Sequence, residues 1–197
     1  MKKTALKKIF IFLMVAVCLT GCVPTAAIIL GATAGSAIVY DKRSFNTMKQ
    51  DQNARYYAQI RLNRDTLLKG HAHISISVFN HIALLVGQAE TPHIRARAYK
   101  LVAQSQSRHI RIVYNEITIA PPIPGIQRAK DCWITTKIRT AMLGKGGLRS
   151  NDFKVVTENA VVYLMGVVSH RQAELVVDVP RHISGVTKVV KVFQYIH

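Results

Sequence analysis

The sequence has few of the residues from which enzyme active sites and disulfide-rich domains are built. Its 197 residues include three cysteines and ten acidic residues, and no two of the acids form an obvious catalytic pair. It also lacks the motifs of serine hydrolases, zinc proteases, P-loop proteins, dinucleotide-binding folds and Cys-x-x-Cys redox proteins. These absences predict a protein that is not an enzyme and that uses no cofactor.

The chain also lacks a long hydrophobic run near its start. The apolar segment that it has there is short and indicates export. The apolar segment 9–19 is too short to cross a bilayer as a helix, and four lysines without an acid precede it. This order is typical of a secretory signal peptide. The segment closes on Leu19-Thr20-Gly21-Cys22, where small residues before a cysteine predict a lipoprotein signal peptide over 1–21 and a lipid on Cys22. The alternative is an ordinary export signal that contains a cysteine by chance.

The small number of cysteines excludes an internal disulfide. Cys18 lies in the segment that is removed and Cys22 carries lipid, so no second cysteine is left for a disulfide to Cys132. An exported domain of this kind must rely on its hydrophobic core. The residues from 22 to 197 are enough for one medium domain or two small ones.

Acidic residues are scarce relative to basic ones. The precursor has 27 lysines and arginines against 10 acids, a net charge of +17, and loss of the four signal lysines leaves 23 against 10, or +13. Each basic residue near an anionic membrane adds about 1 kcal/mol to binding. For an exported lipoprotein we therefore expect an anionic phospholipid surface as the partner, rather than nucleic acid or a small-molecule substrate. The alternative is a solubilising charge spread over the surface, since no block of basic residues stands out.

A second uncharged segment, 23–40, follows the lipidated cysteine. Gly31 and Gly35 have the spacing that packs transmembrane helices against each other. The segment is nevertheless short, begins with Pro24 and already has a lipid anchor beside it. We interpret 22–48 as a tether that lies along the membrane.

The two halves of the chain match each other when one is shifted by 79 residues. The shift superimposes Asn80 on Asn159 and Gly87 on Gly166, and it places 113–117 on 192–196. We therefore expect two copies of one small domain, in a constant register down to the last strand. Prolines 121, 122 and 124 cannot continue a helix or strand and predict a linker. The predicted boundaries are 49–119 for the first domain, 120–128 for the linker and 129–197 for the second domain.

Each copy carries the element order α-β-β-α-β. Apolar residues at helical spacing open both copies, two β-rich runs follow around an asparagine, and a second helix precedes the last β-rich run. Joining the last two strands through a helix requires a right-handed crossover. The predicted fold class is α+β, with a three-stranded mixed sheet and two helices on one of its faces in each copy. The predicted helices are 54–68, 91–105, 131–143 and 170–183, and the predicted strands are 73–79, 82–87, 109–119, 153–157, 160–168 and 186–196.

The first helix of the second copy has two different faces. At 100° per residue, Ile134, Ile138, Ala141 and Met142 form an apolar face that we expect to contact the sheet. Outside that face lie Trp133, Lys137, Thr140 and Leu143, and an exposed tryptophan beside a lysine suits a headgroup interface. Aligning the two helices through Ile60 and Ile138 sets Arg55 opposite Trp133, so the first copy lacks the aromatic residue. The alternative is that Trp133 packs against the neighbouring domain.

Four short phrases, together with the signal and the repeat, resemble the dual BON-domain lipoproteins. The phrases are Asp-Lys-Arg-Ser at 41–44, Val-Tyr-Asn-Glu-Ile at 113–117, Trp-Ile-Thr-Thr-Lys at 133–137 and Val-Thr-Glu-Asn at 156–159. The resemblance implies a non-enzymatic lipoprotein of the outer membrane that faces the periplasm, binds anionic phospholipid and supports envelope integrity.

The resemblance also implies where the lipid binds. It assigns Trp133 and Leu143 as lipid contacts on the first helix of the second domain, with Lys137 and Arg139 as headgroup partners. Many relatives have glycine after the hairpin asparagine, where this chain has His81 and Ala160. We therefore expect a departure from the type I′ turn that Asn-Gly forms.

Other interpretations remain open at this point. The same helix could serve a protein-interaction adaptor that docks envelope assembly or division machinery. His71 and His73 alternate at a strand entrance and could bind a metal, but no further ligand clusters with them, so we predict solvated histidines and no metal site. Cys132, near a helix start, could have a lowered pKa, and we prefer a structural role for it.

Overall fold

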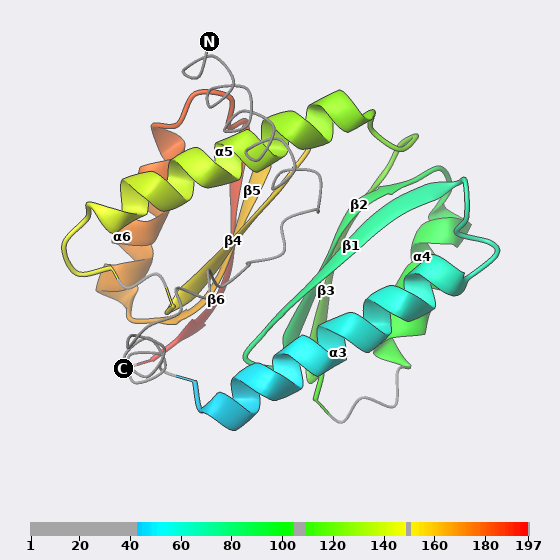
Figure 1. Ribbon diagram of the computed structural model, residues 1–197, viewed down its shortest axis with the longest axis horizontal. Helices are drawn as coiled ribbons and strands as arrows, with labels where there is room; N and C mark the ends of the chain where they lie inside the picture. The colour runs from blue at the N-terminus through cyan, green and yellow to red at the C-terminus, as the bar shows by residue number, and fades with distance from the viewer. Residues whose placement is uncertain (1–42, 105–108, 149–150, 197) are drawn as a thin grey trace, which may run out of the picture.

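The computed structural model describes residues 43–104, 109–148 and 151–196. The predicted signal peptide, the predicted lipidation site Cys22 and the predicted tether up to residue 42 lie outside the described residues. The described chain forms two successive units, each with the order α-β-β-α-β (Figure 1). The predicted α+β fold of two tandem α-β-β-α-β domains is confirmed.

The first unit consists of two helices and a mixed sheet. Strand β2 pairs antiparallel with β1 through a hairpin and parallel with β3 through the α4 crossover, which gives the strand order β1-β2-β3. The elements are α3 (Phe45–Arg64), β1 (Ala72–Phe79), β2 (Ile82–Ala89), α4 (Pro92–Ala103) and β3 (Ile112–Ile119).

The second unit repeats this topology. Strand β5 is the central strand, antiparallel to β4 and parallel to β6. The elements are α5 (Gly125–Leu143), β4 (Phe153–Glu158), β5 (Val161–Val168), α6 (His170–Arg181) and β6 (Lys188–Tyr195).

The first helix of each unit begins earlier than its apolar pattern predicts. Helix α3 begins at Phe45 behind Ser44, whose hydroxyl accepts a hydrogen bond from the Thr47 N–H at 3.1 Å. Helix α5 begins at Gly125 behind Pro124, so residues 125–128 of the predicted linker form its first turn. Most residues of these first turns are exposed, and apolar periodicity therefore gives no signal there.

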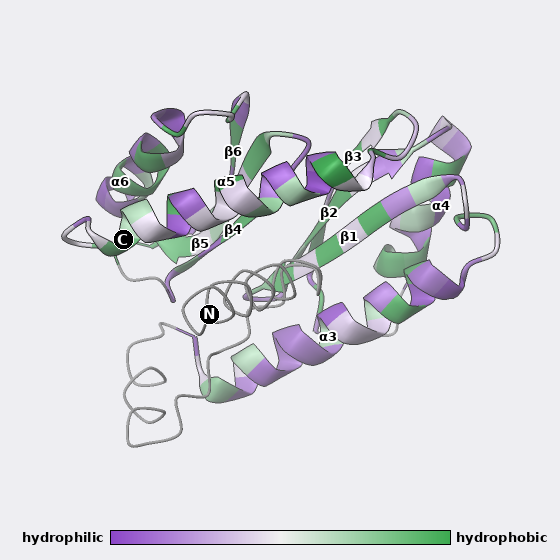
Figure 2. Ribbon diagram, turned by 45° about the horizontal axis from the view of Figure 1, so that its top comes forward, coloured by the Kyte–Doolittle hydropathy of each residue, from purple (hydrophilic) through white to green (hydrophobic). Residues whose placement is uncertain are grey.

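Three hydrophobic cores build four layers, with the two sheets inside and a helix pair outside each sheet (Figure 1). Each sheet buries one face against its own helices and the other face against the second sheet. Strand β2 is therefore buried along its whole length, as expected for a strand covered on both faces. Figure 2 shows this contrast, with hydrophobic colour along the strands and a mostly hydrophilic α3. The core between the sheets contains Phe79, Ile82, Leu84, Val86, Tyr163, Met165 and Val192.

Polar contacts close both ends of the core between the sheets. At one end Asn80 donates from Nδ2 to Gln194 Oε1, and Gln194 donates from Nε2 to the Asn80 carbonyl at 3.3 Å. At the other end Gln88 donates from Nε2 to Glu158 Oε1 at 2.9 Å and accepts from the Ile123 N–H of the connecting segment at 3.2 Å. Hydrogen bonds therefore link the two units to each other, and one of them links the first unit to the connecting segment.

The repeat holds its predicted register only in the hairpins. Ile74 faces Gly87 in the first hairpin, and Phe153 faces Gly166 in the second, as the shift of 79 residues requires. In the last strands, however, Gly87 pairs with Ile117, whereas Gly166 pairs with Phe193. The prediction of a constant register to the end is therefore wrong. Alternating Val and Ile residues fit several registers equally well, and the hydrogen-bond ladder selects one of them.

The first helices also align differently from the prediction. The buried residues Asp51, Ala54, Ala58 and Leu62 of α3 correspond to Asp131, Ile134, Ile138 and Met142 of α5. This alignment sets Asn53, and not Arg55, opposite Trp133. The choice of Arg55 was wrong because Ile60, used as the anchor, is only partly buried and does not belong to the main apolar stripe.

Both hairpin turns are of type I′ although neither contains glycine. The central residues have positive φ angles, 48° and 66° at Asn80 and His81, and 48° and 64° at Asn159 and Ala160. The expectation of a different turn is therefore wrong. A residue other than glycine or asparagine in this conformation costs roughly 1–2 kcal/mol, so another interaction must stabilise the turns.

A buried aspartate from the preceding helix supplies that interaction. Asp51 accepts from the Asn80 and His81 N–H groups at 2.7 and 2.9 Å. Asp131 accepts from the Asn159 and Ala160 N–H groups at the same two distances. Hydrogen bonds to a charged acceptor are about twice as strong as neutral ones. They hold both turns and lock each first helix to its hairpin.

Candidate functional site

Helix α5 is held firmly against its sheet, which fixes the face that it presents to solvent. Ile134, Ile138 and Met142 are at most 5% exposed, in agreement with the predicted sheet-facing stripe. Thr135 donates to Thr157 Oγ1 at 2.7 Å, and Asp131 binds the hairpin turn. The helix therefore has one defined outer surface.

Large apolar side chains lie on that outer surface. Trp133 is 56% exposed, Leu143 75% and Ile126 68%. None of them belongs to the three hydrophobic cores. The alternative in which Trp133 packs against the first domain is therefore wrong, and α5 carries an exposed apolar surface.

Ile126 and Trp133 belong to a stripe of side chains along one side of α5. The sequence predicted only part of this stripe. Residues 126, 130, 133, 137 and 140 follow each other at intervals of three or four, so they lie on one side of α5. Ile126 and Lys130 were missed because the helix was predicted to begin at residue 131. The same spacing, traced back to Pro124, would have included them.

The two predicted headgroup partners lie on opposite flanks of α5. Lys137 donates from Nζ to the Ser184 carbonyl at 2.7 Å, beside the α6–β6 connection. Arg139 donates from Nη2 to the Val155 carbonyl at 3.3 Å, over the edge strand β4. The structure therefore does not bring the four predicted residues into one cluster. Lys130 is exposed and has no hydrogen bond to any residue that the structure describes, so its ammonium is available to an anion.

The electrostatic character of α5 is uniformly basic on its outside. Its one acid is Asp131, which is buried and committed to the hairpin turn. The exposed cations therefore meet no acid of their own helix. The basic residues of α5 are Arg128, Lys130, Lys137 and Arg139.

The histidines considered for a metal lie at the start of β1. His71 Nδ1 lies 2.7 Å from Glu90 Oε2, and burial, with a contribution from Arg128, lowers the pKa of His73. Residues 43–104, 109–148 and 151–196 contain no group of three or more His, Cys, Asp or Glu side chains placed to hold a metal ion. Within the same ranges no helix is long and apolar enough to cross a bilayer. Cys132 is half-buried on the flank of α5.

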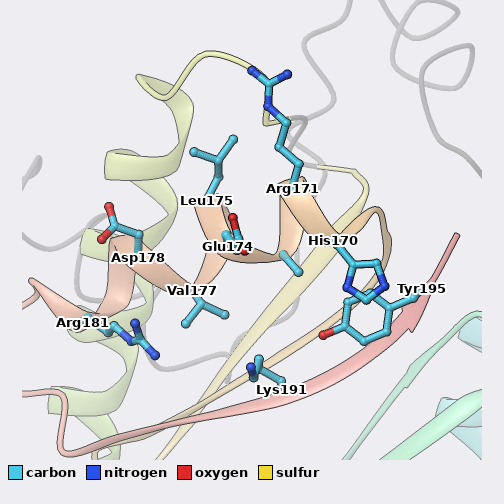
Figure 3. Close-up of a pocket in the computed structure, with 10 residues that line it drawn as sticks. His170, Arg171, Glu174, Leu175, Val177, Asp178, Arg181, Lys191 and Tyr195 are labelled. Carbon is cyan, nitrogen blue, oxygen red and sulfur yellow. The ribbon is translucent and has the colours of Figure 1, made fainter. Parts of the chain in front are cut away.

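An open concavity of about 620 Å³ lies on α6 and β6, and no predicted site residue lines it (Figure 3). Its charged residues are of both signs, Arg181 and Lys191 beside Glu174 and Asp178. At one end the His170 ring stacks on Tyr195, with the ring centres 4.4 Å apart (Figure 3). The walls lack the mostly apolar lining that small-molecule pockets have. We therefore place the candidate site on the outer face of α5.

Comparison with known proteins identifies the repeated unit. A family model of the BON domain matches residues 58–121 and again residues 130–196. The chain belongs to the BON family. This BON protein is similar over its whole length to the outer membrane lipoprotein DolP of Haemophilus influenzae, with 33% identity over 196 residues and 100% of both chains covered. It is also similar to the 21 kDa hemolysin of Actinobacillus pleuropneumoniae, with 35% identity over 156 residues and 79% of each chain covered. The predicted resemblance is confirmed, and the chain is a dual BON-domain, outer-membrane lipoprotein of the DolP type.

Proposed function

We propose that this BON lipoprotein binds the surface of an anionic phospholipid bilayer through helix α5. In this proposal a lipid on Cys22 holds the chain to the periplasmic side of the outer membrane, and the contact supports envelope integrity without catalysis. The observation that carries the proposal is the exposed apolar surface of Ile126, Trp133 and Leu143 on a helix whose outside is basic and free of acids.

The arrangement suits a helix that lies flat on a membrane. Ile126 and Leu143 stand at the two ends of α5, roughly 25 Å apart at 1.5 Å per residue. Trp133 lies between them, and tryptophan prefers the headgroup level of a bilayer. Burying one such side chain contributes about 1.5–3 kcal/mol, and a nearby Lys130 ammonium adds about 1 kcal/mol on an anionic surface.

A contact of this size is weak for a protein in solution. A single lipid chain likewise gives only marginal membrane binding, and two signals together give stable attachment. A lipid on Cys22 would keep α5 at a high effective concentration near the same bilayer. We infer that the lipid and the helix act together. The lipid on Cys22 keeps the protein at the membrane, and α5 sets the orientation of the protein on the membrane surface.

The test uses the only tryptophan of the chain as a probe. The mature chain without its lipid is mixed with vesicles of phosphatidylglycerol or of phosphatidylcholine. We expect the Trp133 emission to shift to the blue with the anionic vesicles alone, and Trp133→Glu to abolish co-sedimentation. The matched control is Tyr99→Glu, which changes an aromatic residue on α4 that is 42% exposed and should keep binding. An unchanged spectrum would overturn the proposal.

A second candidate function is a protein-interaction adaptor that uses the same helix. The observation in its favour is that Lys137 and Arg139 already donate to backbone carbonyls, which leaves much of the outer surface apolar and few cations available. A photocrosslinker at position 137 would capture an assembly or division protein in cells if this function holds. Capture of a defined protein, with no spectral response to vesicles, would favour the adaptor over the lipid contact.

A further inference from the structure

A second group of basic side chains lies where the two units meet. Arg43 donates from Nη1 to Asp51 Oδ2 at 3.1 Å, and its guanidinium lies 3.8 Å above the centre of the Phe79 ring. Phe79 belongs to the core between the two sheets. Arg43 therefore stands at the edge of the interface, on the side of the first unit.

The second unit contributes two more cations at the same edge. Arg139 is held over the edge strand β4 by its bond to the Val155 carbonyl. Lys154 is the preceding residue of β4, and because side chains alternate along a strand, it points to the opposite face from Val155. Val155 contacts the helices of its own unit, so Lys154 is on the face that meets the first unit.

Arg55 completes the group from helix α3. It follows Asp51 by four residues, so the two side chains lie on the same side of the helix. Burial, and then the charges of Arg55, Arg43 and Arg139, lower the pKa of Lys154 to about 8. Cations from both units therefore act on one another across the interface. We call Arg43, Arg55, Arg139 and Lys154 the seam cluster.

Among the residues that the structure describes, Asp51 is the one acid that acts on the Lys154 ammonium. Asp51 opposes the effect of the cations on Lys154, but its oxygens already accept from two backbone N–H groups and from Arg43. Within the ranges that the structure describes, the side chains of Lys154 and Arg55 have no hydrogen bond or ion pair. Cations that are partly withdrawn from water without a partner lower the stability of a fold. A group whose pKa is shifted by burial and by neighbouring charges is a candidate for a functional site.

We propose that the seam cluster binds a phosphate-bearing anion between the two BON domains. A guanidinium group donates two parallel hydrogen bonds to two phosphate oxygens, and a lysine ammonium adds a compact positive charge. The residue types of the seam cluster therefore fit a phosphate ester. The site does not rest on the proposed lipid contact, because Trp133, Ile126 and Leu143 lie on the outer face of α5 and take no part in it. The phosphate can belong to a lipid headgroup or to a soluble compound, and the experiment separates the two.

An anion bound here contacts residues of both units at once. It binds the folded, docked arrangement and not the unfolded chain, so it stabilises the protein in proportion to its concentration. It also relieves the repulsion among the four cations. The proposal therefore predicts a rise in melting temperature that depends on the seam cluster.

The test uses the mature chain with Cys22→Ser, so that no lipid is attached. Inorganic phosphate and glycerophosphoglycerol are titrated at constant ionic strength, while the melting temperature and the NMR signals of the Lys154 side chain are followed. Phosphate also stabilises proteins without binding a site, so the comparison is with Arg55→Gln/Lys154→Met. We expect a rise of a few degrees beyond that of the double variant, and a shift of the Lys154 signals.

Two controls make the result specific. Lys100→Gln removes an exposed cation of α4 and should respond as the wild type does, and Lys154→Arg should retain the response. The double variant should melt at or above the wild-type temperature without anion, because it loses repulsion, and this shows that it folds. Equal responses of the wild type and the double variant would overturn the proposal.

Vesicles distinguish the source of the phosphate. A response to the soluble anions assigns a soluble ligand. A response confined to phosphatidylglycerol vesicles, and weakened in the double variant, assigns a lipid headgroup. No seam-dependent response in either arm overturns the proposal, whatever Trp133 reports. Trp133→Glu should keep the response to soluble phosphate, so failure of the lipid contact and failure of the seam site give different results.

Discussion

Helices α3 and α5 are equivalent inside and different outside. Each of the four buried residues of α3 has a buried counterpart in α5, including the aspartate that holds the following hairpin. On the outside, the three large apolar residues of α5 have polar counterparts in α3. Asn46 replaces Ile126, Asn53 replaces Trp133 and Asn63 replaces Leu143, and all three asparagines are exposed. The repeat keeps one scaffold, and the two copies differ at these three surface positions, although α3 has exposed aromatic residues of its own at Phe45, Tyr56 and Tyr57.

The shared part of the comparison gives the largest expected effect. Asp131→Ala removes two short hydrogen bonds to a charged acceptor and leaves a turn with positive φ angles unsupported. At about 1.5–3 kcal/mol for each such bond, we expect a loss of roughly 3–6 kcal/mol in the free energy of unfolding. Asp51→Ala should behave alike in the first copy. Chemical denaturation measures both values.

The turn itself provides the control for this prediction. Ala160→Gly removes the steric cost of the left-handed conformation without touching the carboxylate. It should stabilise the wild type slightly and recover part of the stability lost in Asp131→Ala. A loss below about 1 kcal/mol for both aspartate variants would show that the buried carboxylates do not hold the turns.

The interactions of these aspartates explain why the turns were not predictable from sequence. Asp51 lies 29 residues before the N–H group that it binds, and neither His81 nor Ala160 suggests a type I′ turn by itself. Local propensity was overruled by a contact that forms only in the folded chain. The helix starts at Phe45 and Gly125 were not predicted for a different reason. The first turns of these helices are mostly exposed, so they contain no apolar pattern.

Other features were predictable because they depend on local periodicity. The element order, the hairpin register and the buried face of α5 follow from apolar spacing and from the repeat. The register of β6 did not, because Ile117 and Phe193 correspond only through their pairing with the glycines of β2 and β5. The seam cluster could not be predicted from the sequence either. Arg55 and Lys154 belong to different copies, and they come near each other only when the two sheets pack together.

The outer faces give the second prediction, a transfer of function between copies. Asn46→Ile, Asn53→Trp and Asn63→Leu together would give α3 the apolar residues of α5. In a Trp133→Glu background we expect the triple change to restore part of the binding to phosphatidylglycerol vesicles. One well-buried aromatic contributes about 1.5–3 kcal/mol, which corresponds to a gain of roughly tenfold to a hundredfold in affinity.

Co-sedimentation with vesicles measures the recovered binding. The control introduces the same residue types on a different helix. The same three residue types introduced at exposed positions of α4 should give no such gain, because α4 lies elsewhere on the molecule and does not face the vesicle together with α3 and α5. If α3 with the three substitutions leaves binding unchanged, three surface positions are not sufficient for the difference between the copies.

The smallest expected effect concerns the face where the two copies meet. The shift of 79 residues sets Glu158 in the place of Phe79, so an acid of the second copy stands where the first has an aromatic. Burial raises the pKa of Glu158, although the hydrogen bond from Gln88 opposes the shift. The folded state therefore favours the protonated form, and stability contributed by Glu158 is present below its unfolded pKa and is lost as the pH rises through its folded pKa.

Glu158→Gln should remove this dependence and keep an acceptor for Gln88. We expect the variant to gain stability relative to the wild type between the ordinary carboxyl range and neutral pH, and to show no gain in more acidic solution. The measurement is the difference in the free energy of unfolding between the two proteins at each pH, because the common contribution of the other acids then cancels. A difference that does not change with pH would mean that the carboxyl group titrates in the folded protein as it does in the unfolded chain, and that the interface between the two copies does not disfavour its charge.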